Sequence, residues 1–378
     1  MIYADNAATT KLDESAFLAM KPFFLDSYAN ASQPYSFSRS AKKALNDARE
    51  IIASCIHAYP DEIYFTSGGT ESDNWAIKGI ACSGIGKCSI VASSIEHHAV
   101  LRSCEALIGA GHSAYFAPVD KQGVVIVNEF SKLLNHSPHL VSIMLANNEI
   151  GTIQPIKTLC ALAHERNTLF HTDAVQAIGH IPVDVKDLGI DLLSASAHKF
   201  NGPKGIGFLY IRRGTKYPSF HSGGTQECGM RAGTENIALI VGMAQALRNN
   251  CEKMEQTAKK LLSFEAELIQ KLRDEDIDFQ RNGGANHIPG NISISFHNLD
   301  GEMLLHRLDL KGICVSTGAA CDSHRTQISH VLKATDCPEE YAKGTIRISL
   351  GNNNTAADIP VIADEIKRII AIDNSMLS

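Results

Sequence analysis

The sequence has 378 residues, enough for two or three domains of ordinary size, and 44% of them are hydrophobic, which excludes a disordered chain. It carries 35 Lys and Arg against 41 Asp and Glu, so neither a nucleic-acid backbone nor an anionic membrane is expected as its main partner. No apolar run is long enough to span a membrane, and the first residues lack the pattern of a secretion signal. We therefore expect a cytoplasmic protein.

Short apolar stretches alternate with helical patterns through the first two-thirds of the chain. This alternation predicts the α/β class, with a mostly parallel sheet covered by helices on both faces. The predicted helices include Ala41–Cys55, His98–Gly109 and Ile156–Arg166. The predicted strands are Ile63–Thr66, Ser89–Ser93, Leu140–Ala146, Leu169–Thr172, Leu192–Ser196 and Gly207–Ile211.

The pattern changes near residue 250. Residues 252–273 have the apolar spacing of a long amphipathic helix, and Asn291–Phe296 and Ile346–Leu350 alternate as strands with one apolar face do. A last helix carries an apolar stripe formed by Ile359, Ile362, Ile366 and Ile369. We expect a smaller α+β domain here, joined to the first by the long helix.

A glycine-containing turn follows the strand Ile63–Thr66. Glycines allow the backbone to approach a ligand closely, and the first N–H groups of a helix favour an anion, so Gly69 and Thr70 are candidates for holding a phosphate. The alternative is an ordinary Ser/Thr N-cap after a tight turn.

Two further candidates follow predicted strands. Asp173 falls at the carboxyl end of a strand, where α/β sheets bind ligands, and a carboxylate there could hold a protonated ring nitrogen. The alternative is an Asp that caps the next helix. Lys199 follows a strand of small residues, where desolvation could make it a Schiff-base nucleophile. The alternative is a solvated loop lysine, such as Lys204 in the next turn.

The ten cysteines show no metal-binding spacing, so we expect reduced thiols and no metal site. Cys321 stands out, because small residues precede it and polar residues follow it, which is typical of an exposed, reactive loop thiol. Arg347 lies on an apolar strand and could grip a carboxylate, although a surface salt bridge is the more frequent outcome. A phosphate turn, an aspartate, a lysine and such an arginine together fit pyridoxal phosphate acting on an amino acid.

From Tyr3 to about residue 370 the chain resembles the cysteine desulfurases of the NifS/IscS type, which are class-V aminotransferases of the fold type I group. The most specific signatures are Phe65–Asn74, Asn147–Gly151, Ser196–Lys199 and Gly318–Cys321. The resemblance implies a large domain with a mostly parallel seven-stranded sheet, over residues 13–255. It also implies a small α+β domain formed by residues 1–12 and 256–378, which would carry the catalytic cysteine loop.

The resemblance implies three catalytic residues. Lys199 would bind the cofactor covalently and move the substrate proton, His97 rather than His98 would stack on the cofactor ring, and Cys321 would accept the sulfur. Asp173 would hold the ring nitrogen. Pyridoxal phosphate would be bound by Gly69, Thr70, His97, Asn148, Asp173, Gln176, Ser196, His198, Lys199 and, from the neighbouring subunit of a homodimer, Thr234. The substrate L-cysteine would contact Asn30, Asn148 and Arg347.

The reaction implied converts L-cysteine to L-alanine, with a persulfide on Cys321 that passes to an acceptor protein or thiol for iron–sulfur clusters, thiolated tRNA or similar products. The alternatives are a selenocysteine lyase or other β-eliminating enzyme, and a weakly active sulfur-relay or scaffold partner. The sequence departs from the family pattern at Tyr35, Ser38, Ala197, Cys228 and Asn352. It also ends at Ser378 without the longer tail of IscS-like members, which makes a dedicated iron–sulfur role less certain.

Overall fold

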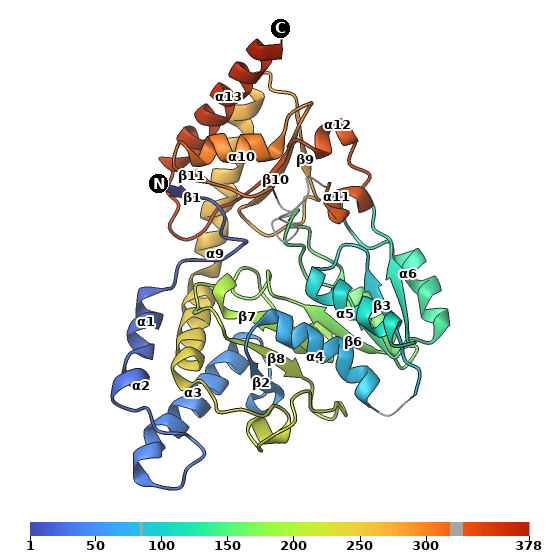
Figure 1. Ribbon diagram of the computed structural model, residues 1–378, viewed down its shortest axis with the longest axis vertical. Helices are drawn as coiled ribbons and strands as arrows, with labels where there is room; N and C mark the ends of the chain where they lie inside the picture. The colour runs from blue at the N-terminus through green and yellow to red at the C-terminus, as the bar shows by residue number, and fades with distance from the viewer. Residues whose placement is uncertain (84–85, 318–327, 378) are drawn as a thin grey trace.

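The fold is built around a seven-stranded sheet in the order β2-β8-β7-β6-β5-β3-β4. A computed structural model describes residues 1–83, 86–317 and 328–377 (Figure 1). The strands β3, β4, β5, β6 and β7 pair in parallel, whereas β8 runs antiparallel to both neighbours. The bounds are β2 Ile63–Thr66, β3 Ser89–Ser93, β4 Ser113–Ala117, β5 Leu140–Ser142, β6 Leu169–Asp173, β7 Leu192–Ser196 and β8 Gly207–Ile211.

All six predicted strands of this sheet exist. The strand β6 extends one residue past its predicted end, to Asp173, and two larger differences occur at β5 and β4. The regular part of β5 ends at Ser142 rather than Ala146, although the N–H groups of Ile143 and Leu145 still donate to carbonyls of β6. The strand β4 was not predicted. It lies at the sheet edge and pairs with β3, and most of its side chains are partly or fully exposed, although four of its five residues are hydrophobic.

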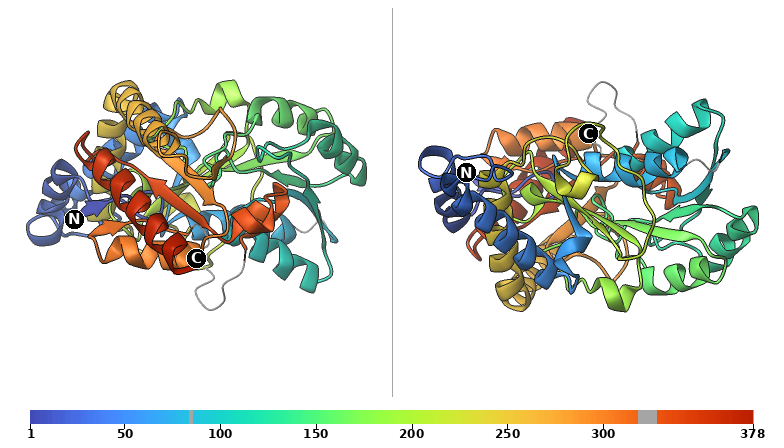
Figure 2. Two further views of the ribbon diagram at one scale, coloured as in Figure 1. Left: turned by 90° about the horizontal axis from the view of Figure 1, so that it is seen from above. Right: turned by 90° about the horizontal axis from the view of Figure 1, so that it is seen from below.

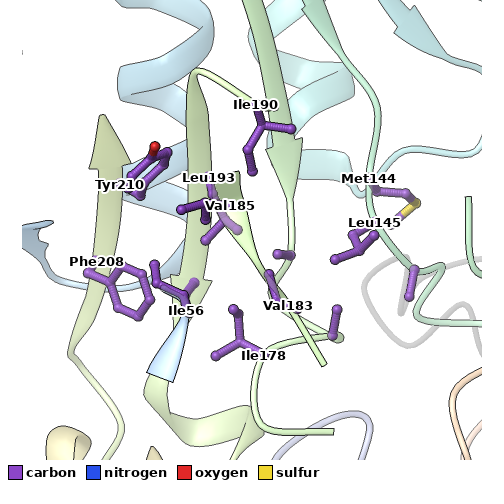
Figure 3. Close-up of a cluster of buried hydrophobic side chains, with 14 of the residues drawn as sticks. Ile56, Met144, Leu145, Ile178, Val183, Val185, Ile190, Leu193, Phe208 and Tyr210 are labelled. Atoms are coloured by element: carbon purple, nitrogen blue, oxygen red, sulfur yellow. The ribbon is translucent and has the colours of Figure 1, made fainter. Parts of the chain in front are cut away.

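The sheet is covered on both faces because successive side chains of its strands point to opposite sides. Along β7, Leu192 packs with Trp75 of α4 on one face, and Leu193 packs into the main core on the other. Figure 3 shows the second face, where Leu193 and Phe208 gather with Val185. The longer helices covering the sheet are α3 Arg39–Cys55, α4 Gly69–Cys82, α5 His98–Gly109 and α7 Ile156–His164.

One helix of 37 residues, α9 Ile237–Arg273, runs from the large sheet to the C-terminal part of the chain (Figure 1). The sequence predicted only residues 252–273, where the apolar stripe is narrow. The first half is instead buried against α1 and α3, so its apolar residues are not confined to one stripe. The Asn236 side chain caps the helix by accepting from the N–H of Leu239.

The C-terminal part has its own core around the antiparallel sheet β12-β10-β9. Figure 2 shows α13 lying across this sheet, and the predicted stripe of isoleucines on α13 is buried there. The elements are β9 Phe279–Asn282, β10 Asn291–Phe296, α10 Gly301–Asp309, β11 Ile313–Cys314, α11 His330–Ala334, α12 Glu339–Ala342, β12 Thr345–Ser349 and α13 Asp358–Leu377.

The N-terminus belongs to this second core. Strand β1, Ile2–Tyr3, pairs in parallel with β11, and Ala4 is fully buried among the C-terminal residues. The chain then crosses to the large sheet, where Thr10 bonds the backbone of His198. The domain boundaries after residues 12 and 255 stay predictions, and α9 passes through residue 255 without a break.

The remaining helices are short and connect the larger elements. In the described ranges, no helix combines the length and apolar character needed to cross a membrane. These short helices are α1 Glu14–Met20, α2 Pro22–Leu25, α6 Val127–Leu133, α8 Val185–Leu188, and the 3₁₀ turns η1 Ser36–Ser38, η2 Pro60–Glu62, η3 Leu134–His136, η4 Ala197–Lys199 and η5 Glu227–Gly229.

Candidate active site

A cavity of about 550 Å³ lies where the carboxyl ends of β6 and β7, the start of α4 and the N-terminal segment meet. Its position agrees with the rule that α/β sheets bind ligands outside the carboxyl ends of their strands. A larger hollow of about 660 Å³, beside Arg212–Pro218, contains none of the predicted residues. The cavity brings together ten of them: Gly69, Thr70, His97, Asn148, Asp173, Gln176, Ser196, His198, Lys199 and Arg347.

One end of the cavity is formed by the first turn of α4. The N-cap residue is Gly68, which has no side chain to cap the helix, so the alternative of a Ser/Thr N-cap is wrong. A Cβ atom placed on Gly69 would lie 2.7 Å from Val175 Cγ2, which only glycine avoids. The exposed N–H groups and the dipole of this 14-residue helix favour a phosphate at this end.

Lys199 enters the cavity from η4, directly after β7. Its Nζ donates to the carbonyl oxygens of Ala7, at 2.6 Å, and Ala8, at 2.9 Å. Lys199 is therefore not a solvated loop lysine, because the N-terminal segment covers it. Lys204 also lines the cavity. Both lysines therefore belong to the same site and differ in their position within it.

Asp173, the last residue of β6, is 5% exposed. Its Oδ1 accepts from the N–H of Val175 at 2.9 Å, in a turn that no helix follows, so the helix-capping alternative is wrong. Burial raises the pKa of Asp173 to about 6, and Lys199 acts in the opposite direction. Gln176 Nε2 donates to the Ala7 carbonyl that also accepts from Lys199, which ties these three residues together.

His97 is the N-cap of α5, and its Nδ1 accepts from the N–H of Ala99. Burial, with Lys199 nearby, lowers the pKa of His97 to about 4, so the ring is neutral near pH 7. His97 lines the cavity, whereas the ring of His98 lies 5.1 Å from that of His330. The arrangement favours His97 over His98, as the sequence predicted.

Arg347 reaches the cavity from β12 and is 3% exposed, so the alternative of a surface salt bridge is wrong. One terminal nitrogen donates to Asp5 Oδ1 at 2.8 Å and the other donates to the Asn148 carbonyl at 2.9 Å. Its Nε has no hydrogen-bond partner among the described residues. The C-terminal sheet thus places a cation at the mouth of a site built mainly from the large sheet.

Three predicted residues are not placed at the cavity. Cys321 lies outside the described residues, so its position stays a prediction. Asn30 is half-buried, its Oδ1 accepts from the N–H of Ser32, and it is not among the residues that line the cavity. Thr234 is exposed, and its predicted role concerns a second subunit. The substrate contact of Asn30 and the partner-subunit contact of Thr234 therefore stay predictions.

The five departures from the family pattern occupy ordered positions. Ser38 is buried, and its hydroxyl donates to the carbonyls of Gln33 and Tyr35. Ala197 is fully buried, and its carbonyl accepts from the N–H of Gly202 at 2.9 Å. Asn352 donates to Asn201 Oδ1, and Cys228 is exposed with a positive φ of 57°.

Buried polar residues beneath the cavity were missed by sequence reasoning. Asp73 belongs to the Phe65–Asn74 signature, and Glu96 directly precedes His97. Their position next to predicted site residues was the only feature of the sequence that could have indicated them. Glu96 is fully buried, and its Oε1 accepts from Ser93 Oγ at 2.5 Å and from the N–H of Met144 at 2.8 Å. Burial raises the pKa of Glu96 to about 8.

We predict a pH-dependent stability from Glu96. A carboxyl whose pKa is raised on folding stabilises the protein at low pH, and this contribution is lost as the pH rises from about 4.5 to 8. Glu96→Gln mimics the protonated form and does not titrate. It should therefore match the wild type near pH 5 and become more stable than it by a few kcal/mol above pH 8. Chemical denaturation of both proteins at the two pH values measures this difference.

The exposed Glu50→Gln is the control, and its difference from the wild type should stay constant between the two pH values. If the free energy of unfolding of Glu96→Gln changes with pH as that of the wild type does from pH 5 to pH 9, Glu96 is ionised in the folded protein and the prediction is wrong.

Comparison with known proteins agrees with this geometry. Residues 2–362 match the aminotransferase class-V family. A cysteine desulfurase IscS of Dictyoglomus turgidum is 47% identical over 372 residues, which cover 98% of this chain and 94% of that protein. A solved NifS-like protein superposes with a TM-score of 0.92 at 37% identity, covering 98% of this chain and 99% of the other. SspA, solved in complex with cysteine, superposes with a TM-score of 0.82 at 35% identity, covering 93% and 99%.

These matches extend over both sheets and confirm the predicted α/β fold of type I. The chain belongs to the class-V aminotransferase family and, within it, to the pyridoxal-phosphate-dependent cysteine desulfurases.

Proposed function

We propose that this cavity removes sulfur from L-cysteine and that the sulfur leaves as a persulfide on Cys321. One observation carries the proposal: Lys199 and Asp173, at the ends of adjacent parallel strands, face a cavity that the glycine-started helix α4 closes. The sulfur then passes to an acceptor protein or thiol.

The residues present fit pyridoxal phosphate. The first turn of α4, with Ser196 and His198 beside it, offers N–H and side-chain groups to a phosphate. Gly69 lets this turn pack closely against Val175, where a Cβ would clash. Asp173 offers a buried carboxylate for a ring nitrogen, and neutral His97 offers a flat surface for stacking. When bound, the cofactor supplies an electron sink for the substrate α-carbon.

The side chains of this chain would divide the work. Arg347 binds the carboxylate of the substrate. Its guanidinium already forms an ion pair with the carboxylate of Asp5, which shows that it can bind this type of group. Lys199 Nζ takes the proton from the substrate α-carbon and later returns a proton, as general base and then acid. The N-terminal carbonyls of Ala7 and Ala8 hold that nitrogen in place.

The sulfur step needs a second nucleophile. The Cys321 thiolate attacks the sulfur of the substrate, a sulfur–sulfur bond forms, and the carbon–sulfur bond breaks. The three-carbon fragment takes up a proton and leaves as L-alanine. Cys321 then carries one extra sulfur atom until an acceptor thiol removes it.

We further propose that the enzyme works as a homodimer in the cytoplasm. The exposed Thr234 would contact the phosphate bound to the partner subunit. Reduced thiols, which persulfide transfer requires, persist in that compartment.

The products made from L-cysteine test this proposal. With a reductant, we expect continuous formation of alanine and sulfide in equal amounts. Without a reductant, alanine should stop near one equivalent per subunit, because the persulfide is not removed. A β-eliminating enzyme would release pyruvate and ammonia in place of alanine, and a scaffold protein would release nothing. Either result would refute the proposal.

A further inference from the structure

A buried aspartate, Asp73, forms part of the cavity wall and has no role in the mechanism above. It lies in the second turn of α4 and is 1% exposed. Its Oδ1 has no hydrogen-bond partner among the described residues. Burying an ionised carboxylate without partners costs much free energy, so this side chain needs an explanation.

The neighbours of Asp73 form a chain of polar groups across the strands. His171 Nδ1 lies 2.9 Å from Ser142 Oγ of β5, and His171 Nε2 lies 2.9 Å from Ser194 Oγ of β7. Ser194 also lies near the Asp73 carboxyl. His171 Nε2 is 3.8 Å from Asp73 Oδ1, which is too long for a hydrogen bond.

None of the groups that face Asp73 in the described structure brings a positive charge. Asp173 of β6 and Glu96, from the segment after β3, are acids, and Ser194 is neutral. Full burial lowers the pKa of His171 to about 3, so His171 is neutral as well. Burial and the nearby Asp173 therefore raise the pKa of Asp73 well above its usual range.

Asp173 differs from Asp73 because a cation acts on it. Lys199 lowers the pKa of Asp173 against the effect of burial. Two buried carboxyls close to each other do not both ionise, and the one that faces the cation gives up its proton first. The surroundings of the two aspartates thus favour a negative charge on Asp173 and a neutral carboxyl on Asp73.

We propose that Asp73 is a positioning residue of this active site: it remains a neutral carboxylic acid in the cavity wall and keeps the negative charge of the pair on Asp173. The inference rests on the proposed role of Asp173 as the partner of the cofactor ring nitrogen. A neutral Asp73 in the cavity wall does not compete for the ring nitrogen, which needs a single carboxylate.

The test compares wild-type, Asp73→Asn and Asp73→Ala holoenzymes. The infrared difference spectrum of wild type minus Asp73→Asn, near neutral pH, should contain the C=O stretch of a protonated carboxyl that shifts in D₂O. The amide is neutral like the acid, so Asp73→Asn should keep the midpoint of the visible-absorbance pH titration within about 0.3 pH unit. Asp73→Ala leaves an empty space in the cavity wall and should weaken cofactor binding about tenfold, with rescue by Asp73→Asn.

Asp173→Asn is the matched comparison, because it removes the proposed charge and should move the same midpoint by about one pH unit or more. An equal shift in Asp73→Asn, or a carboxylate band in place of the protonated one, would show that Asp73 is ionised and overturn the proposal. Asp73→Asn decides the outcome if Asp73→Ala does not fold. Neither readout requires turnover, so failure of the cysteine reaction stays distinguishable.

Discussion

Replacing Lys199 with alanine is expected to remove the visible absorbance of the purified protein and to lower alanine formation from L-cysteine by at least about a thousandfold. The lysine nitrogen both joins the cofactor and moves the substrate proton, and the cavity offers it at a fixed place beside Ala7 and Ala8. An absorbance spectrum after incubation with pyridoxal phosphate, followed by an alanine assay, measures both effects.

Lys204→Ala is the matched control, because Lys204 lines the same cavity five residues further along the chain. It should keep the visible band. If the band persists in Lys199→Ala and disappears in Lys204→Ala, the assignment of the two lysines is reversed. A wild type that stays colourless with pyridoxal phosphate would contradict the cofactor itself.

The second large effect concerns the sulfur acceptor. Cys321→Ser should lower alanine and sulfide formation by at least about a hundredfold while the visible spectrum of the bound cofactor stays unchanged, because a hydroxyl does not form a persulfide at this site. Alanine formation in the presence of a reductant, together with mass spectrometry of the protein after exposure to L-cysteine, detects the missing persulfide.

Cys82→Ser serves as the control for this change, since Cys82 is an exposed thiol at the end of α4 and does not line the cavity. It should leave both the rate and the persulfide mass unchanged. Undiminished turnover in Cys321→Ser would exclude Cys321 as the nucleophile and would favour a β-eliminating or selenocysteine-type reaction, in which this thiol is dispensable.

These two variants separate the proton-transfer step from the sulfur-transfer step of the proposed reaction. The described residues of the site come from different parts of the fold. Lys199, Asp173 and His97 come from the large sheet and its connections. Arg347 comes from β12 of the small sheet, which also pairs with β10 in the C-terminal core. The N-terminal segment joins them, since Asp5 bonds Arg347 and Ala7 bonds Lys199.

Much of the fold could be predicted because buried strands and helices show characteristic patterns of hydrophobic residues in the sequence. The strands β6 and β7 are buried on both faces and appear as short apolar runs, and their ends located Asp173 and Lys199. The edge strand β4 also contains a short apolar run, Ala114–Ala117, but this run was not predicted as a strand. The first half of α9 is buried too broadly to show a single stripe, so its start was predicted fifteen residues late.

The sequence by itself determined the α/β class and the strand-end positions of Asp173 and Lys199, whereas the choice of His97 over His98 stays a prediction from the resemblance. Those inferences depend on local patterns and on neighbours along the chain. Only the tertiary structure showed that Arg347 is buried against Asp5. It also showed that the Ala7 carbonyl accepts hydrogen bonds from both Lys199 and Gln176. The proximity of the buried Asp73 to Asp173 was likewise visible only in the folded chain. The physical reason is that charge and desolvation depend on which distant segments fold together, and such contacts leave no periodic pattern in the sequence.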